Sequence, residues 1–355
     1  MYQFIFRHLI VRTDAETAHE HTVKALSLAQ RFPVVLSVIR NLWGRKAPSQ
    51  VPARKDGGPL PRAVPGVLGL AAGMDKNAMA IEAWDALGFG FVEIGTVTPY
   101  GQSGNEKPRL WRLPDTREVR NAMGFNNLGS RFVASRLRRL RSHPRGRRII
   151  VGANIGKNKN TPEEDAIRDY VMATKDVARW VDYLVINVSS PNTPGLRNLQ
   201  DVSQLEAIAV AVREQARVSA RREVPVLVKI APDLADEDIE DIADMVSRLG
   251  LSGLVATNTT INHAFETGGL SGPCLRPRAE EIIRRLRKRL GPDPIIIGVG
   301  GIETAEDARR FLTSGADLVQ GLTSFVYQGP AWPGRINREI AQDTKRYWPV
   351  LRVAV

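Results

Sequence analysis

From about residue 66 onward, short apolar runs rich in β-branched residues alternate with longer amphipathic segments. Several runs are apolar on both faces, as expected of parallel strands that helices cover. The pattern predicts eight strands, each followed by a helix, at VLGLAAG (67–73), FVEIGTV (91–97), IIVGANIG (149–156), YLVINVSS (183–190), VPVLVKIA (224–231), GLVATNTT (253–260), PIIIGVGG (294–301) and LVQGLTS (318–324).

Eight strand–helix repeats predict an α/β fold of the (β/α)8 TIM-barrel class over residues 66–355, with an open doubly wound sheet as the alternative. No GxGxxG motif leads from a predicted strand into a helix, and this argues against a dinucleotide-binding sheet. Helix ends are visible in ETAEDARRFLTSG, where Thr304 and Asp307 predict a capping box and Gly315 predicts the C-terminal stop.

Residues 1–46 have a helical pattern and predict a small N-terminal helical extension. Thr13 and Glu16 predict a capping box, which is followed by a weakly apolar stripe at Ala18, Thr22, Ala25, Leu26 and Ala29. A second helix is expected from Pro33 to Gly44, with one face formed by Val35, Val38, Ile39 and Leu42. The segment 47–65, rich in Pro and Gly, predicts a linker. The helices form either a lid on the barrel or a foot in the headgroup layer of a membrane.

The composition is that of a globular protein, with 355 residues of which 43% are hydrophobic and 25% charged. The single cysteine, Cys274, excludes an intrachain disulfide and a thiolate metal cluster, so redox chemistry would need a bound cofactor. There is no uninterrupted apolar run of about 20 residues, and the opening MYQFIFRHLIV lacks a cleavage site. We therefore expect neither a membrane span nor export.

The net charge of +12 favours anionic partners, which could be nucleic acid, an anionic lipid surface or small acidic substrates. Much of this charge lies in two clusters, RLRRLRSHPRGRR (136–148) and RRLRKR (284–289), for which solvated helix faces are the simplest interpretation. No aromatic residues interleave the cations to stack bases, so no nucleic-acid partner is expected.

Small and polar residues end the predicted strands, where the functional site of a barrel of this class lies. The Gly-rich turns in GVGGI and GADLVQGLTS can direct backbone N–H groups toward a phosphate. Four amides and two lysines converge at the same end, namely Asn121, Asn187, Asn192, Asn258, Lys76 and Lys229. Amides suit a planar ligand with alternating C=O and N–H edges, such as a pyrimidine. A buried lysine suits a substrate carboxylate or the negative charge of a reduced flavin. No metal site is expected, because no ligand set stands at metal spacing.

The segment NVSSPNTPGL (187–196) is the sharpest local feature. Pro191 stops the strand, which leaves Asn187 and Ser189 on one face while Ser190 and Asn192 project from the turn. A Ser-Pro-Asn turn by itself is common in structural loops, so its function depends on its neighbours.

Taken in order, these segments closely resemble the quinone-dependent (class 2) dihydroorotate dehydrogenases of pyrimidine synthesis. The resemblance covers essentially the whole chain and is most specific at AAGMDKN, EIGTVTP, NAMGFNN, ANIGKN, NVSSPNTPGL, VLVKIAPD, ATNTT, GGLSG and GVGGI. It implies an enzyme that oxidises (S)-dihydroorotate to orotate with FMN and passes the electrons to a membrane quinone, in UMP biosynthesis.

The resemblance also implies ligand contacts. One FMN per chain would lie across the barrel mouth, with its phosphate at Gly272, Gly301, Leu322 and Thr323. Its isoalloxazine and ribityl portions would contact Ala72, Thr96, Asn154, Asn187, Lys229 and Thr257. Dihydroorotate would be held by Lys76, Asn121, Ala122, Met123, Gly124, Phe125, Asn187, Asn192, Asn258 and Thr259.

Ser190 matches the catalytic base of the family, which takes a proton from C5 of dihydroorotate while C6 delivers hydride to the flavin. The class 1 enzymes carry a cysteine there, so Ser190 and the N-terminal helices together favour a quinone acceptor. The helix pair would form a quinone tunnel, with His19 and Arg112 facing the head group, and would attach the chain peripherally to the cytoplasmic face of the cell membrane. Ala122 and Leu322 stand where many relatives carry Arg and Tyr, so quinone contacts do not carry over intact.

Two rival functions fit parts of the sequence. A flavin barrel that acts on uridine in RNA would explain the positive charge, but such enzymes use a catalytic cysteine in a barrel loop, and Cys274 lies near the phosphate end. A non-enzymatic membrane-interaction protein would use the helix pair and would leave the polar strand ends unexplained.

Overall fold

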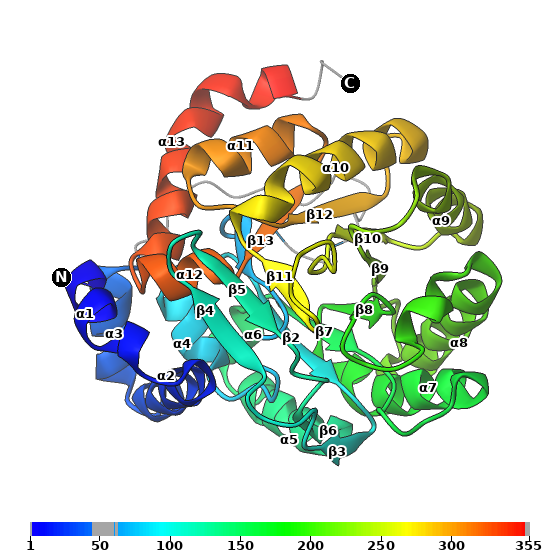
Figure 1. The fold of residues 1–355 in the computed structure, drawn as a ribbon, viewed down its shortest axis with the longest axis horizontal. Coiled ribbons are helices and arrows are strands. Elements are labelled where there is room, and N and C mark those ends of the chain that lie inside the picture. Colours follow the sequence, from blue (N-terminus) through cyan, green and yellow to red (C-terminus); the bar gives the residue numbers. More distant parts are fainter. Residues whose placement is uncertain (1, 45–59, 61–62, 352–355) are drawn as a thin grey trace.

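The eight predicted strands close into a parallel barrel in the computed structural model, which describes residues 2–44, 60 and 63–351 (Figure 1). Each strand is hydrogen-bonded to the next around the ring, in the order β1 (Leu68–Leu70), β2 (Val92–Val97), β7 (Val151–Ile155), β8 (Tyr183–Asn187), β9 (Val226–Ile230), β10 (Gly253–Ala256), β12 (Ile295–Val299) and β13 (Leu318–Gly321). The closed ring confirms the (β/α)8 prediction and excludes the open doubly wound sheet.

Helices surround the barrel and cover the outer faces of its strands (Figure 1). They are α4 (Ile81–Ala86), α5 (Ser130–Arg141), α6 (Pro144–Arg148), α7 (Ala166–Val177), α8 (Val202–Ala220), α9 (Asp236–Leu249), α10 (Arg276–Leu290), α11 (Ala305–Thr313), α12 (Thr323–Gln328) and α13 (Trp332–Leu351). The predicted capping box of Thr304 and Asp307 is present at the start of α11.

Large apolar side chains fill the barrel interior toward the N-terminal ends of the strands. Phe91, Val185, Leu227 and Val255 form one fully buried cluster inside the ring, together with Tyr183, and Leu60 and Val64 pack against the same cluster. Since this half of the barrel is solid, the C-terminal ends of the strands are left as the place for a ligand.

Two small antiparallel sheets, which the apolar pattern did not predict, add to the barrel. One pairs β3 (Tyr100–Gln102) with β6 (Asn127–Gly129), and the other pairs β4 (Leu110–Leu113), β5 (Glu118–Asn121) and β11 (Gly269–Ser271). The second sheet crosses the barrel in Figure 1. In it Asn121 stands opposite both Leu110 and Gly269, so the sheet fixes a predicted substrate residue at the end of β5.

The N-terminal extension consists of α1 (Tyr2–His8), α2 (Ala15–Ala29) and α3 (Pro33–Leu42), which lie together on one side of the barrel near α4 and α12 (Figure 1). The predicted capping box of Thr13 and Glu16 is wrong. Asp14 is the N-cap of α2 and accepts a hydrogen bond from the Thr17 N–H at 2.8 Å. Glu16 turns toward the barrel instead, because the Arg109 guanidinium offers it an ion pair at 2.8 Å.

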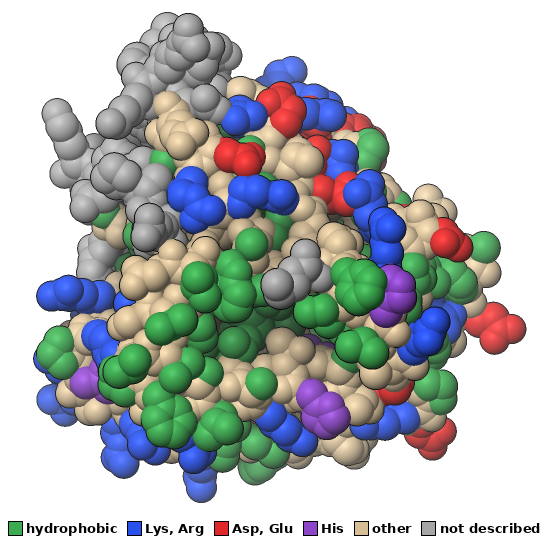
Figure 2. Space-filling view, turned by 90° about the vertical axis from the view of Figure 1, so that its left-hand side faces the viewer, with side chains coloured by type: hydrophobic (Ala, Val, Ile, Leu, Met, Phe, Trp, Pro, Cys, Tyr) green, Lys and Arg blue, Asp and Glu red, His purple; other side chains and the backbone are tan. Residues whose placement is uncertain are grey.

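Helix α3, which corresponds to the second predicted helix, has two different faces. Leu36 and Ile39 are buried in the core, whereas Val35, Val38 and Leu42 are exposed. Phe4, Leu9, Leu28, Phe32 and Val34 add to this exposed apolar surface, which surrounds a hollow in Figure 2. Within the described residues no single helix could span a membrane, although α2 and α3, bent by 117°, pass together by length and composition alone. Most of the predicted linker 47–65 lies outside the described residues.

Candidate functional site

A cavity of about 400 Å³ lies at the C-terminal ends of the barrel strands and extends to the N-terminal helices. It brings together nearly all of the residues predicted to form the site: Ala72, Lys76, Thr96, Asn121, Met123, Gly124, Phe125, Asn187, Ser190, Asn192, Lys229, Thr257, Asn258, Thr259, Gly272, Gly301, Leu322, Thr323, His19 and Arg112. Asn154 and Ala122 are not part of its described lining.

Asn154 acts on the cavity through its neighbours. Its side-chain oxygen accepts hydrogen bonds from Thr96 Oγ1 at 2.6 Å and from Asn187 Nδ2 at 2.9 Å. These bonds join the ends of β2, β7 and β8. Asn154 therefore fixes the rotamers of two side chains that line the cavity.

Beneath this amide layer lies Glu93, a fully buried residue that sequence reasoning missed as a site residue. Its carboxylate accepts hydrogen bonds from Asn154 Nδ2 at 2.9 Å, Gln320 Nε2 at 2.7 Å and Tyr183 Oη at 3.2 Å. Burial, and then the charge of Glu93, raise the pKa of Tyr183, so the phenol stays protonated and donates. The signal for this residue was a glutamate in the middle of an otherwise apolar strand.

Lys229 is 5% exposed and lines the cavity. Its ammonium forms no hydrogen bond or ion pair with the part of the chain that is described. Burial lowers the pKa of Lys229, and the negative charge of Glu93 opposes this shift. A buried cation without a protein acceptor implies that the ligand supplies one.

Lys76, in the loop after β1, is the second cation of the cavity. Burial lowers its pKa to about 8, and the nearby charges of Glu16 and Arg109 act in opposite directions. Its ammonium also has no hydrogen-bond partner among the described residues. Lys76 is therefore available to an anionic group of a ligand.

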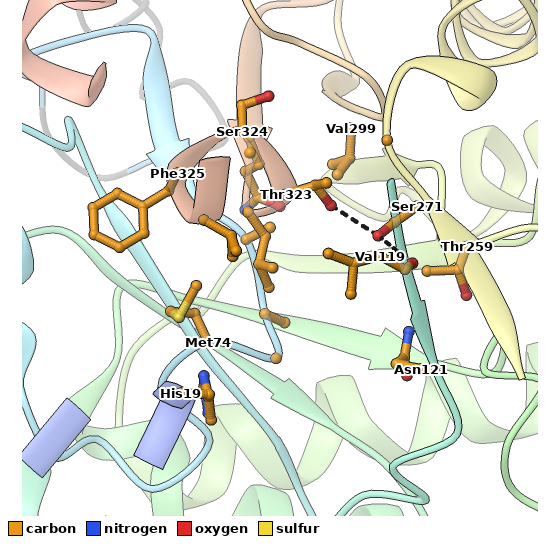
Figure 3. A pocket seen from close by; sticks show the side chains of 18 of the residues that line it. His19, Met74, Val119, Asn121, Thr259, Ser271, Val299, Thr323, Ser324 and Phe325 are labelled. Atoms are coloured by element: carbon orange, nitrogen blue, oxygen red, sulfur yellow. Dashed lines mark hydrogen bonds between the residues drawn. The ribbon is translucent and has the colours of Figure 1, made fainter. Parts of the chain in front are cut away.

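The turns after β11, β12 and β13 form a backbone cradle. Gly272 and Gly301 adopt φ values of +135° and +71°, and a Cβ at Gly301 would stand 2.9 Å from the Gly272 carbonyl oxygen. The N–H groups of Gly301 and Leu322 have no acceptor within the described ranges. Thr323 Oγ1 lies 2.8 Å from Ser271 Oγ (Figure 3). Such a cradle suits a phosphate.

Ser190 lies at the other side of the cavity, in the turn after β8, and is 6% exposed. Its Oγ accepts a hydrogen bond from the Asn192 N–H at 3.3 Å. Asn192 Nδ2 donates to Asn121 Oδ1 at 3.1 Å, and Asn105 Nδ2 donates to the Asn192 carbonyl at 3.0 Å. These amide contacts hold the turn against β5.

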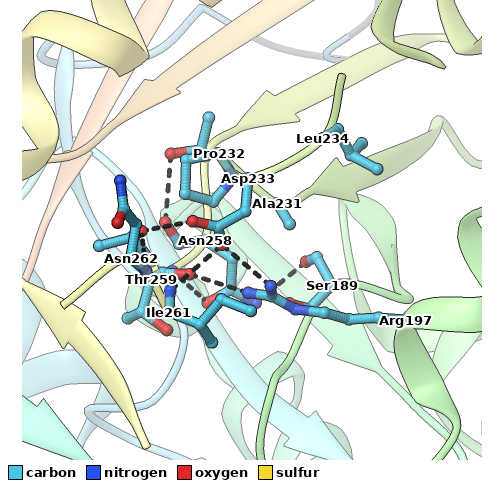
Figure 4. A network of polar contacts seen from close by, with 12 residues as sticks. Ser189, Arg197, Ala231, Pro232, Asp233, Leu234, Asn258, Thr259, Ile261 and Asn262 are labelled. Atoms are coloured by element: carbon cyan, nitrogen blue, oxygen red, sulfur yellow. Dashed lines mark hydrogen bonds and ion pairs between the residues drawn. The ribbon is translucent and has the colours of Figure 1, made fainter. Parts of the chain in front are cut away.

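An ion pair that was not predicted ties this turn to the next two strands (Figure 4). Arg197 Nη1 lies 2.9 Å from Asp233 Oδ2, after β9. The same guanidinium donates to the carbonyls of Ser189 and Thr259, each at 3.2 Å. Ser189 Oγ in turn accepts a hydrogen bond from Asn258 Nδ2 at 3.0 Å. The loops after β8, β9 and β10 are thereby fixed as one unit.

The opposite end of the cavity opens between the N-terminal helices, where its lining includes Leu26 and Trp43. His19 lies there (Figure 3), and burial together with the charge of Lys76 lowers its pKa to about 3, so the ring is neutral. Arg112 donates to the Thr13 carbonyl, and burial lowers its pKa. Within the described residues no group of His, Cys, Asp or Glu side chains is arranged to hold a metal ion.

The fold and the site define a (β/α)8-barrel protein with a cavity at the C-terminal ends of the strands, which offers a phosphate cradle, an amide-rich floor and an apolar entrance. The family model for dihydroorotate dehydrogenase matches residues 62–343, and the chain belongs to this family.

Relatives named dihydroorotate dehydrogenase (quinone) match almost the whole chain. That of Thermobifida fusca (strain YX) is 48% identical over 98% of this chain and 93% of its own length. That of Nocardioides sp. (strain ATCC BAA-499 / JS614) is 48% identical over 96% and 97%. A crystal structure described as DHODH in complex with ferulenol from Eimeria tenella superimposes with a TM-score of 0.84 at 34% identity, and covers 97% of this chain and 96% of that one.

Proposed function

We propose that this protein is a dihydroorotate dehydrogenase that oxidises dihydroorotate to orotate with bound FMN and uses a membrane quinone as electron acceptor, in UMP biosynthesis. The observation that carries the proposal is the pair of cavity lysines, Lys76 and Lys229, whose ammonium groups have no acceptor in the described chain. Two anionic groups of bound ligands would complete them. The relatives named for this activity support the assignment.

The residues present fit FMN. Gly272, Gly301, Leu322 and Thr323 would hold the phosphate, because the cradle leaves N–H groups without acceptors. The remaining predicted contacts would hold the rest of the cofactor: Ala72, Thr96, Asn187, Lys229 and Thr257, with Asn154 positioning Thr96 and Asn187. Lys229 would face the edge of the flavin where negative charge collects on reduction. When bound, FMN supplies the acceptor for the hydride from C6 of the substrate.

The residues of the chain account for the other steps. Lys76 binds the substrate carboxylate, and Asn121, Asn187, Asn192 and Asn258 pair with the ring C=O and N–H groups. Ser190 Oγ takes the proton from C5. Because a free serine is a weak base, the buried position of Ser190 and a chain of neighbouring hydroxyls or waters must assist it.

Quinone would enter between α2 and the β4–β5 sheet and meet the neutral His19 and Arg112. The exposed apolar residues of α1, α2 and α3 would lie in the membrane interface, on the cytoplasmic face, with an anionic lipid surface as partner. This proposal is tested by anaerobic spectroscopy of the purified protein. Dihydroorotate should bleach the flavin absorbance and a quinone should restore it, whereas protein without releasable FMN would contradict the assignment.

The affinity for dihydroorotate should fall as the pH rises through about 8, where Lys76 loses its proton. Because burial lowers the pKa of Lys76, this loss begins near pH 8, and above that pH the protonated fraction declines about tenfold for each further pH unit. The measurement is kcat/KM against pH, which reports the free enzyme. A Lys76→Met variant should have a low kcat/KM without this alkaline limb, and a limb that persists would assign it to another group.

Glu93→Gln should raise the midpoint potential of bound FMN. The substitution removes the buried negative charge of Glu93 near Lys229. The positive charge of Lys229 is then offset less, so it stabilises the negative charge of the reduced flavin more. The expected shift is on the order of tens of millivolts, since 30 mV corresponds to about 1.4 kcal/mol for a two-electron couple. Spectroelectrochemical titration measures it, with Glu206→Gln on the exposed face of α8 as the control. Equal potentials in all three proteins would refute the positioning role of Glu93.

A further inference from the structure

A second cavity, of about 120 Å³, lies outside the site already described, between the end of α2, the start of α4 and the outer face of α5. Its lining includes Ser27, Arg31, Arg136, Arg139, His143 and Glu82. Three of these residues are arginines and one is acidic. Two of the arginines belong to the cationic cluster at 136–148.

The cations of this cavity differ from the other arginine cluster, at 284–289, in their partners. Arg285 lies 2.6 Å from Asp236, and Arg289 lies 2.6 Å from Asp244, so that cluster binds α10 to α9. By contrast, the Arg31 and Arg139 side chains, which are exposed and line the rim of the cavity, form no ion pair or hydrogen bond with the described residues. An anion from outside the chain is therefore the partner that would neutralise them.

Arg136 completes the cationic wall. Its guanidinium donates to the carbonyls of Ala78 at 2.9 Å and Met79 at 3.0 Å, which fixes its position. Burial lowers the pKa of Arg136; the charge of Asp75 opposes this shift, and the charges of Arg139 and Arg31 add to it. The three arginines thus lie close enough to repel one another, and an anion between them would relieve this repulsion.

Two further features shape the cavity. Ser27 is 8% exposed, and its hydroxyl has no partner in the described part of the chain, so it is free to donate to a ligand. Glu82 would oppose an anion, but its carboxylate oxygens lie 3.7 Å from His143 Nε2 and 3.8 Å from Arg145 Nε. Arg145 therefore offsets part of the Glu82 charge on the side of α6, and the three arginines outnumber the one carboxylate of the cavity.

The position of the cavity identifies the anion. Ser27 stands on α2 beside exposed Leu28, Arg31 and exposed Phe32 lie in the turn between α2 and α3, and exposed Val34 follows at the start of α3. Lys and Arg side chains border the hydrophobic face in Figure 2. We propose that the cavity binds the phosphate of an anionic phospholipid whose acyl chains lie along the apolar face of α2 and α3. Such a bound lipid would fix the orientation of the large cavity's entrance, between the N-terminal helices, relative to the membrane. This role goes beyond the proposed enzymatic function.

The test measures binding of the full-length holoprotein to phosphatidylcholine vesicles with and without phosphatidylglycerol. The variant Arg31→Gln/Arg139→Gln removes two cavity cations. Its control, Lys24→Gln/Arg138→Gln, removes one cation from α2 and one from α5; like Arg31 and Arg139 these residues are exposed, but they lie outside the cavity. Because both variants lose the same charge, general attraction to the surface weakens equally in the two.

We expect the cavity variant to lose at least about tenfold more affinity for phosphatidylglycerol vesicles than the control. Affinity for pure phosphatidylcholine should be weak and equal in all forms. Equal losses in the two variants would overturn the proposal. A second arm adds inorganic phosphate at the same concentration as the lipid phosphate and at constant ionic strength. Release of the protein from the vesicles under these conditions would also overturn the proposal. Thermal midpoints, and flavin reduction by dihydroorotate without vesicles, should match in all forms. The vesicle-binding comparison therefore stands whether or not the enzymatic assignment holds.

Discussion

Replacing Ser190 with alanine is expected to slow the reduction of bound flavin by dihydroorotate by about 10²–10⁴-fold, the usual contribution of a general base. The side chain is buried, lines the cavity and contacts the Asn192 N–H, so its replacement removes the hydroxyl proposed to take the C5 proton. The measurement is anaerobic stopped-flow absorbance at neutral pH. FMN content should stay at one per chain.

Ser189→Ala is the matched control for this experiment. Ser189 is the preceding residue of the same turn, fully buried, and its hydroxyl binds Asn187 and Asn258 rather than lining the cavity. We expect its effect to stay within about tenfold, since one neutral hydrogen bond contributes about 1 kcal/mol. Equal losses in both variants would mean that the turn acts only through its shape, and Ser190 would not be the base.

The barrel could be predicted because each of its strands carries a recognisable apolar pattern within its own short segment. A parallel strand covered by helices must be apolar on both faces, so runs such as VPVLVKIA can be recognised as strands from the sequence alone. The two small antiparallel sheets have no such apolar pattern. Their strands are three or four residues long, and their stability comes from pairing with distant segments, as β11 pairs with β5.

The barrel geometry predicted that the residues at the strand ends gather at one cavity, but it did not predict the contacts that support them. The Asn154 contact with the cofactor stays a prediction; its hydrogen bonds to Thr96 and Asn187, which the sequence did not indicate, position two side chains that line the cavity. Arg197 and Asp233 stand in different loops, and nothing in either segment indicates the pairing. Such contacts arise only when the closed ring brings strand ends together.

The mistaken capping box has a similar cause. Thr13 and Glu16 have the right spacing, and spacing is all that the sequence shows. In the folded chain, Arg109 outcompetes the backbone for Glu16 with a charge-assisted pair. Glu16 thereby joins α2 to the segment before β4, and Arg109 also donates to the Ser103 carbonyl at 2.6 Å.

This buried pair should be the strongest single link between the N-terminal helices and the barrel. Both side chains are nearly inaccessible, at 4% and 7% exposure. Glu16→Ala would leave the Arg109 guanidinium buried without its counter-ion, which typically costs about 3–5 kcal/mol in the free energy of unfolding. The exposed pair of Arg248 and Glu206, at a similar 2.7 Å, is the control, and Glu206→Ala should cost about 0–1 kcal/mol. Urea denaturation of both variants measures the difference.

The same pair should depend on pH in a defined direction. Burial raises the pKa of Glu16, but the hydrogen bonds and charges of Arg109 and Lys107 outweigh it, so the pKa is lowered overall. A lowered folded pKa means that the stabilisation is complete above the ordinary glutamate range and is lost as the pH falls through the folded value. The deficit of Glu16→Ala should therefore be full at neutral pH and shrink in acid. A deficit that is the same at every pH would show that Glu16 acts through packing rather than charge.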